Sequence, residues 1–239
     1  MDDGKEAVLS AIRAGLAQAV LPAASYEPPG PPPALEAGAG AATDPESLRQ
    51  SFIREAQALS AQVYSPTHQA EAMDVFLGIV ESCGAQAVLA WDEEHLPLAG
   101  SWGALAEAGV QILDTMLPGD QTARDARLAE LDQGAVGVTG ALAGLADTGS
   151  LALLSGPGRG RLASLLPPVH VALLPVTSLY PTMAAFLAAH PGVVRQASNL
   201  VFISGPSRTA DIEQTVTMGV HGPRELHVVL IPPTDWTDE

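Results

Sequence analysis

Cysteine is nearly absent from this chain, since Cys83 is the only one among 239 residues. A single cysteine cannot form an intramolecular disulfide, and it cannot hold an iron–sulfur cluster without thiolates from another protein. It precedes Gly84 at an expected helix end, so we interpret it as a small buried hydrophobic residue. No spacing of histidines and carboxylates is typical of a metal site, so the sequence predicts no metal.

Basic and aromatic residues are also scarce. The chain has 11 Lys and Arg against 27 Asp and Glu, a net charge of −16, and only 4% of its residues are aromatic. Nucleic-acid binding depends on basic contacts to phosphate, so this composition argues against it. Residues 1–133 carry 20 acidic and 6 basic side chains, whereas residues 134–239 carry 7 and 5. We therefore expect any small anion to bind in the second half.

Long apolar runs are missing as well. No stretch reaches the roughly 20 apolar residues that a membrane-spanning helix requires. The first residues, Met1-Asp2-Asp3, are acidic and no short apolar run follows them, so we expect no secretory signal. These absences predict a cytoplasmic protein without a membrane-inserted segment.

Three regions are expected along the chain. Residues 1–20 are predicted to form an N-terminal helical arm, because apolar residues recur at helical spacing: Val8, Leu9, Ile12, Leu16 and Val20. Residues 21–43 contain six prolines among alanines and glycines, which is typical of a semi-extended linker. Residues 44–239 are long enough for a single α/β domain.

Within this domain the apolar pattern changes once. Residues 44–83 show helical spacing and predict two helices that pack on the rest, the first started by a Thr43–Glu46 capping box. Short apolar runs then predict strands at 87–91, 110–113, 135–138, 151–154, 169–174, 200–203 and 226–231. Helices are expected at 101–108, 121–131, 178–189 and 208–216. Continuous apolar strands that alternate with helices predict a mainly parallel sheet with helices on both faces.

The stretch from Ser204 to Glu213 is the first candidate site. The apolar run at 200–203 stops abruptly, and a rigid polar loop follows. We interpret it as a strand, a tight loop and a helix N-terminus, where free N–H groups and a partial positive charge favour anions. The predicted ligand-binding residues are Gly205, Ser207, Arg208, Thr209 and Asp211. Without a ligand, Ser207 would be a helix cap and Asp211 would complement the helix dipole.

Two further loops add candidates. Asp147 and the following Thr148, Gly149 and Ser150 read as a tight turn beside a strand, with Asp147 as a proton-transfer group and the other three as ligand-binding residues. An aspartate that bonds the backbone of its own turn is the alternative. The glycine-rich loop ending at Arg161 could cradle an anion through backbone N–H groups, with Arg161 as a ligand-binding residue, or could be a surface turn.

Histidines supply the remaining catalytic candidates. His170 begins an expected strand after Pro167-Pro168, and His221 lies in an irregular loop close in sequence to Ser207. Both are candidate proton-transfer groups, although a lone histidine in a strand is more often a core or edge residue. No residue pair specifies a nucleophile with an adjacent base, so the sequence leaves open whether the chain is an enzyme.

Five segments in order resemble the LUD (lactate-utilisation) domain family, specifically its stand-alone LutC-like members. They are residues 137–141, 147–151, 164–170, 203–213 and 219–223. The resemblance implies a fold of the NagB/RpiA/CoA-transferase-like group over about residues 85–231. The chain departs from the family at Asp147, where a glutamate is usual, so its carboxylate is one methylene shorter.

The resemblance implies a role in L-lactate oxidation and electron transfer. Such chains work as accessory subunits with an iron–sulfur LUD protein and a cysteine-rich protein, and the clusters are expected on these partners rather than on this chain. The implied ligand is a small carboxylate or an anionic cofactor. Two alternatives stay open: a free-standing enzyme that acts on a sugar phosphate or a CoA thioester, and a scaffold without a ligand.

Overall fold

The computed structural model describes residues 8–11, 13–14, 44–195, 197–210, 216–218 and 221–233, with backbone alone at 209–210 and 216–218. The chain divides into two units, Met1–Glu36 and Ala37–Glu239. In the first unit the described residues are helical. None of the helices in the described ranges is both long and apolar enough to cross a bilayer. The second unit holds all the elements discussed below.

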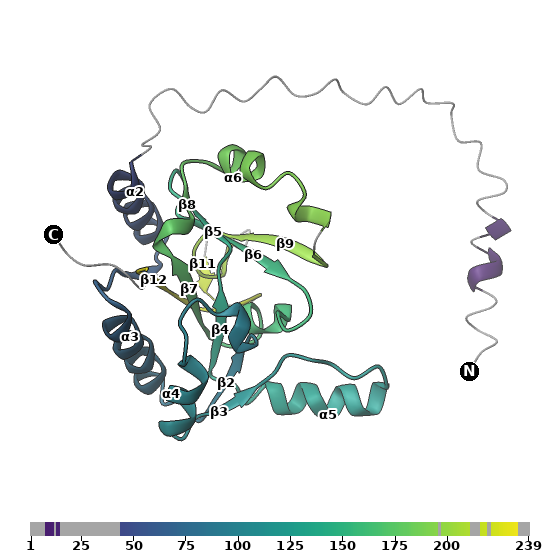
Figure 1. Cartoon of the computed structure of the whole chain (residues 1–239). Coiled ribbons are helices and arrows are strands. Elements are labelled where there is room, and N and C mark those ends of the chain that lie inside the picture. The colour runs from purple at the N-terminus through teal and green to yellow at the C-terminus, as the bar shows by residue number, and fades with distance from the viewer. Residues whose placement is uncertain are drawn as a thin grey trace, which may run out of the picture. The chain divides into compact units, whose positions relative to one another are not determined.

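Six parallel strands form the main sheet, in the order β1-β12-β7-β4-β2-β3 (Figure 1). Their bounds, in the same order, are Gln62–Tyr64, Glu225–Ile231, Val169–Pro175, Val136–Gly140, Ala87–Ala90 and Gln111–Leu113. This sheet confirms the expected mainly parallel α/β fold. From β2 the chain continues to β3, the neighbour of β2 at the edge of the sheet. From β4, which lies on the other side of β2, it continues within this sheet in the opposite direction, to β7 and β12. The connections therefore diverge between β2 and β4, which makes this point the topological switch of the sheet.

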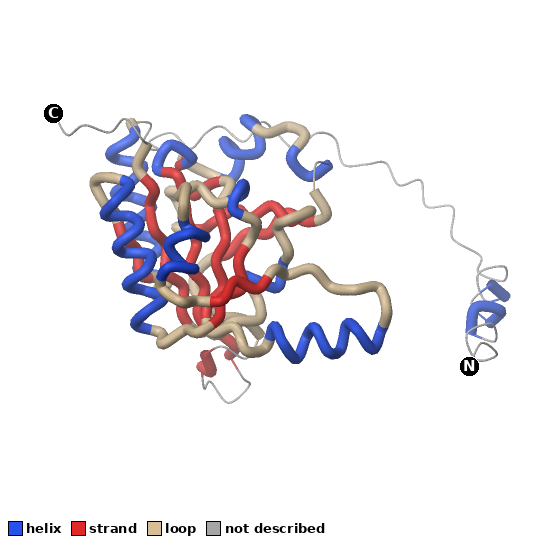
Figure 2. The backbone as a smooth tube through the Cα atoms, turned by 60° about the horizontal axis from the view of Figure 1, so that its bottom comes forward, coloured by secondary structure: helices blue, strands red, loops and turns tan. Residues whose placement is uncertain are grey.

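Two helices cover one face of this sheet. The helix α3 (Gln69–Ser82) contacts β12, and α4 (Ser101–Glu107) contacts β3. The helix α2 (Pro45–Ala58) lies at the edge and contacts β1. In both views, α5 (Gln121–Leu131) extends away from the strands (Figures 1 and 2), and only its last residue is buried.

A second sheet and a short 3-10 helix share the opposite face. The 3-10 helix η2 (Arg161–Ser164) packs on β4. The second sheet has the order β8-β5-β6-β9, with bounds Leu179–Tyr180, Ala143–Leu145, Ser150–Ser155 and Asn199–Ile203. Its outer face is covered by α6 (Met183–Ala189), whose buried Phe186 packs against Ala143 and Leu145. The expected helix at 178–189 starts only at Met183, because residues 179–180 pair with β5 instead.

The helix α2 begins one residue later than the sequence predicts. Its N-cap is Asp44, whose carboxylate accepts a hydrogen bond from the Ser47 N–H at 2.9 Å, while Thr43 lies outside the described residues. Pro45 occupies the first helical position, where its missing N–H costs nothing. The helix α3 ends at Ser82, as expected near Gly84, which follows the C-cap Cys83 with a φ of +60°.

The helix predicted at 208–216 is wrong. Residues Arg208–Ala210 form β10 and residues Val216–Met218 form β11, and the two strands pair antiparallel with Thr209 opposite Thr217. β-Branched threonine and valine favour strands, and this preference outweighs the loop-to-helix pattern. Ser207 is therefore not a helix cap, and its N–H donates to the Pro223 carbonyl at 2.8 Å.

Candidate functional site

The structure brings two of the predicted loops together at the carboxyl end of α2. Gly149 has a φ of +62°, and a Cβ there would lie 2.2 Å from the backbone nitrogen of Ala56. Gly205 has a φ of +80°, and a Cβ there would lie 2.6 Å from the Leu59 carbonyl oxygen. The hydroxyls of Ser150 and Ser204 are 2.7 Å apart. The motif glycines therefore allow both loops to approach the helix closely.

Arg208 binds the end of the same helix. Its Nη2 donates a hydrogen bond to the Leu59 carbonyl at 3.0 Å, and α2 has no basic residue in its last turn. A cation at this position satisfies a carbonyl that the helix leaves free and complements the helix dipole. The contact gives Arg208 a structural role that the sequence did not predict.

Asp147 and Thr148 are exposed on the turn before β6. The Asp147 N–H donates to the Pro181 carbonyl, and the N–H groups of Thr148 and Gly149 donate to the Leu145 carbonyl. Within the described part of the chain, no hydrogen bond or ion pair engages the Asp147 carboxylate. The turn is thus fixed through its backbone, while the carboxylate faces solvent.

Three predicted residues line one small cavity. His170, Gly205 and Ser207 surround a space of about 20 Å³, together with Ser164, Ile203, Pro206, Pro223 and Leu226. A cavity of this size holds about one water molecule. It does not have room for a carboxylic acid or a cofactor.

His170 is a buried neutral base. Its side chain is almost inaccessible, and its Nε2 lies 2.9 Å from the Thr139 hydroxyl. Burial, and to a lesser extent the nearby His227, lowers the pKa of His170 from 6.5 to about 3. The imidazole therefore stays neutral at pH 7 and is too weak a base for proton transfer there.

This histidine makes the fold sensitive to acid. Below pH 6.5 this histidine is protonated in the unfolded chain but stays neutral in the folded chain. Its contribution to the free energy of unfolding is therefore fully present above pH 6.5 and decreases as the pH falls below that value. Between pH 7.5 and pH 5.0 we expect His170 to remove about 2 kcal/mol from the free energy of unfolding. Urea unfolding at the two pH values checks this in the wild type and in His170→Gln.

The variant should lose most of that pH difference. The remaining pH difference includes the contribution of His227. Burial also lowers the pKa of His227, and Glu225 partly opposes this effect. An equal pH difference in the two proteins would contradict the assignment to His170.

The remaining predicted residues are dispersed. His221 is exposed on a loop beside Ser207, and Arg161 is exposed at the start of η2. Thr209 contributes its backbone to β10, and Asp211 lies outside the described residues. The structure thus brings two of the predicted loops together at α2, and the candidate side chains that it describes do not share one enclosed site.

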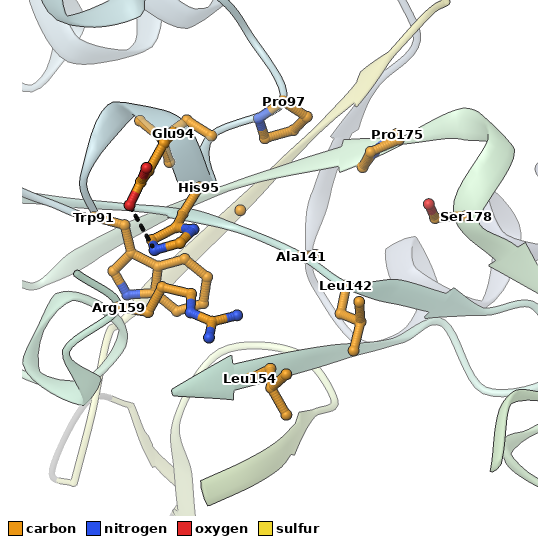
Figure 3. Close-up of a pocket in the computed structure, with 12 residues that line it drawn as sticks. Trp91, Glu94, His95, Pro97, Ala141, Leu142, Leu154, Arg159, Pro175 and Ser178 are labelled. Atoms are coloured by element: carbon orange, nitrogen blue, oxygen red, sulfur yellow. Dashed lines mark ion pairs between the residues drawn. The ribbon is translucent and has the colours of Figure 1, made fainter. Parts of the chain in front are cut away.

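A larger pocket, which the sequence reasoning missed, lies at the carboxyl ends of β2, β4 and β7 (Figure 3). Its volume is about 300 Å³. The lining residues are Trp91, Glu94, His95, Leu96, Pro97, Gly140, Ala141, Leu142, Leu154, Arg159, Pro175 and Ser178. The glycine-rich loop at 156–161 was a signal for it, but sequence reasoning selected Arg161, whereas Arg159 lines the pocket.

Backbone contacts hold this loop in place. The Asp92 N–H donates to the Gly158 carbonyl at 2.9 Å, and the Trp91 indole donates to the Gly160 carbonyl at 3.0 Å. Gly156 and Arg159 donate their N–H groups to each other's carbonyls. These two amides are therefore engaged within the loop and are not available as the expected anion cradle.

The side chains present opposite charges to the pocket. The Nε of Arg159 is buried and has no hydrogen-bond partner among the described residues. The guanidinium points into the pocket beside Trp91 in Figure 3. The exposed Glu94 carboxylate lies 3.5 Å from the His95 Nε2. The arrangement offers a cation, an imidazole and apolar walls to a small ligand.

Comparison with known proteins gives the relatives of the chain. Lactate utilization protein C of Halalkalibacterium halodurans is 34% identical over 158 residues, which is 64% of this chain and 66% of that protein. Lactate utilization protein C of Shouchella clausii is 33% identical over 155 residues, 64% of this chain and 65% of that protein. The match thus spans slightly less than two thirds of either relative. An uncharacterized protein of Neisseria meningitidis serogroup B is 33% identical over 74% of both chains.

The fold also has a solved counterpart. The crystal structure of a DUF162 family protein from Deinococcus radiodurans matches with a TM-score of 0.59 and 21% identity, covering 80% of this chain and 99% of that one. This likeness supports the α/β fold. The LUD domain family model matches residues 49–231, which include the six-stranded and the four-stranded sheet. The chain therefore belongs to the LUD domain family.

Proposed function

We propose that this chain acts in L-lactate utilisation, as an accessory subunit of a lactate-oxidising iron–sulfur complex in the cytoplasm. The observation that carries the proposal is the similarity to two proteins named Lactate utilization protein C, within a LUD domain match over residues 49–231. The proposed partners are an iron–sulfur LUD protein and a cysteine-rich protein. The proposed ligand is a small carboxylate or an anionic cofactor.

The cysteine content supports an accessory role. Iron–sulfur clusters are held mainly by several cysteine thiolates, and this chain supplies only Cys83. Burial raises the pKa of that thiol, which favours the protonated form over the thiolate that binds iron. We therefore assign the electron carriers to the partner proteins.

The alternative of a sugar-phosphate or CoA enzyme has less support. The loop at 156–161 favoured it weakly as an anion cradle, and two backbone N–H groups of this loop are engaged within the loop. The ligand-binding roles predicted for Thr148, Ser150 and Ser207 remain predictions.

A native pull-down tests the proposed function. We expect a tagged chain expressed at its native level in lactate-grown cells to elute with an iron–sulfur protein and a cysteine-rich protein, identified by mass spectrometry and by bound iron. Cells that lack the gene should grow poorly on L-lactate and normally on glucose. Elution of the chain alone from lactate-grown cells, together with normal growth of the deletion strain on L-lactate, would refute the proposal.

A further inference from the structure

We propose that the pocket at the carboxyl ends of β2, β4 and β7 binds a small organic monocarboxylate, with the guanidinium of Arg159 as its anchor. The place of the pocket, its size and its cation come from the structure. The choice of 2-hydroxy and 2-oxo acids within the monocarboxylates rests on the proposed function.

The pocket lies where an open parallel sheet binds its ligands. The strand connections diverge between β2 and β4, and a crevice opens outside the carboxyl ends of strands at such a point. Trp91 directly follows β2, and Gly140 and Ala141 stand at the end of β4. The pocket therefore occupies the switch point itself, whereas the cavity beside His170 lies near the start of β7.

Arg159 is half-buried, and one of its donors, Nε, is buried without a partner among the described residues. A buried donor left unpaired costs free energy. Its side chain points into the pocket rather than toward a carboxylate of the protein (Figure 3). A planar guanidinium binds a carboxylate through two parallel hydrogen bonds, which its two Nη groups can donate. Among the described residues, no hydrogen bond or ion pair engages these Nη groups, so they are available to a ligand carboxylate.

The walls limit the size and the charge of the ligand. Leu142, Leu154 and Pro175 make much of the lining apolar, and the volume is about 300 Å³. This volume is at the lower end of the range for small-molecule sites, so a small acid fits and a dinucleotide does not. One guanidinium and the Glu94 carboxylate both line the pocket, which favours an anion of single charge. A monocarboxylate with a short apolar part matches these features.

The surroundings hold this geometry before a ligand arrives. Gly158 has a φ of +67°, and a Cβ there would lie 2.5 Å from the Asp92 carboxylate. A Cβ at Gly140 would lie 2.3 Å from the His95 carbonyl oxygen. Both glycines let the Arg159 loop and the His95 turn pack tightly around the pocket. Preorganisation of this kind lowers the entropic cost of binding.

Isothermal titration calorimetry on the purified full-length chain tests the inference. The probes are L-lactate, pyruvate and acetate, with inorganic phosphate as the comparison. We expect the wild type to bind at least one of the three monocarboxylates, and Arg159→Gln to weaken that binding at least about tenfold. Glu94→Gln should strengthen binding, because it removes a competing negative charge. Arg195→Gln deletes an exposed arginine outside the pocket and should change the affinity less than about twofold.

Three results would overturn the inference. The first is no binding of any of the three acids by the wild type at up to about 20 mM, a range that includes the weakest physiologically useful affinities. The second is an equal loss in Arg159→Gln and Arg195→Gln, which indicates general charge attraction. The third is phosphate binding as tight as that of the acids. Thermal melting establishes that each variant is folded. The calorimetry and the pull-down are independent measurements. Partners without acid binding would contradict only the inference about the pocket, and acid binding without partners would contradict only the proposed complex.

Discussion

Gly137→Ala is expected to lower the free energy of unfolding by about 3 kcal/mol or more. Gly137 lies inside β4, against the 3-10 helix η2. A Cβ there would lie 1.7 Å from the Ala163 carbonyl oxygen and 2.8 Å from its carbonyl carbon. Both atoms belong to the backbone, so the added methyl cannot be accommodated by a side-chain rotation. Either β4 or η2 must move, and the pocket beyond the end of β4 would be distorted with it.

Urea unfolding followed by circular dichroism measures this effect. The matched control is Gly78→Ala, on an exposed position inside α3 where a Cβ meets nothing within 4 Å. This control should raise the free energy of unfolding by about 0.5–1 kcal/mol, because alanine favours a helix more than glycine does. A Gly137→Ala protein within 1 kcal/mol of the wild type would show that η2 moves away from β4 at little cost.

Gly149→Ala is expected to destabilise the chain by about 3 kcal/mol, through two separate effects. Its φ of +62° is strained for any residue with a Cβ. The Cβ would also lie 2.2 Å from the nitrogen and 2.5 Å from the Cα of Ala56, in the last turn of α2. The turn would have to separate from the helix, which would also disturb the contact between Ser150 and Ser204.

Gly84→Ala separates the two effects. Gly84 has nearly the same φ, +60°, but a Cβ there meets nothing within 4 Å. This variant should lose only the backbone term, about 1 kcal/mol. The difference between the two variants in urea unfolding then measures the close approach to α2. Equal losses would mean that the turn shifts freely and that Gly149 is needed only for its backbone angle.

The sequence predicted the strands that are buried on both faces. Runs such as Val169–Leu174 and Leu226–Ile231 are apolar apart from His170 and His227, because both strands are buried, and this pattern is visible locally. The helices α4 and α5 were also located nearly to the residue. Local spacing and apolar content were sufficient for these elements.

The strands that were missed are defined by their pairing with other strands. Ala143–Leu145 contains no β-branched residue and becomes β5 only because β6 and β8 pair with it. Arg208–Ala210 becomes a strand because it pairs with Val216–Met218. The side-chain pattern of each segment taken alone does not show this pairing, so the polar loop after β9 was interpreted as a helix start.

For the candidate site, the sequence predicted which kinds of residue matter better than it predicted where they lie in the structure. Gly149 and Gly205 were predicted as ligand-binding residues. The structure shows that glycine is needed at both positions because the two loops approach α2, a helix about 90 to 160 residues earlier in the chain. Arg161 and Arg159 differ by two positions in one loop, and only the loop conformation decides which one faces the pocket. The sequence therefore indicated an arginine in this loop but not which of the two side chains points into the pocket.

The pairing of β1 with β12 has a consequence for how the protein forms. Gln62 and His227 are neighbours in the sheet although they lie 165 residues apart. The edge strand β1 reaches the rest of the main sheet only through β12, so a nascent chain has to wait for β12 to emerge from the ribosome before β1 has a neighbour to pair with. Until then the edge of β7 that pairs with β12 has unpaired backbone N–H and carbonyl groups, and chaperones could bind there during synthesis.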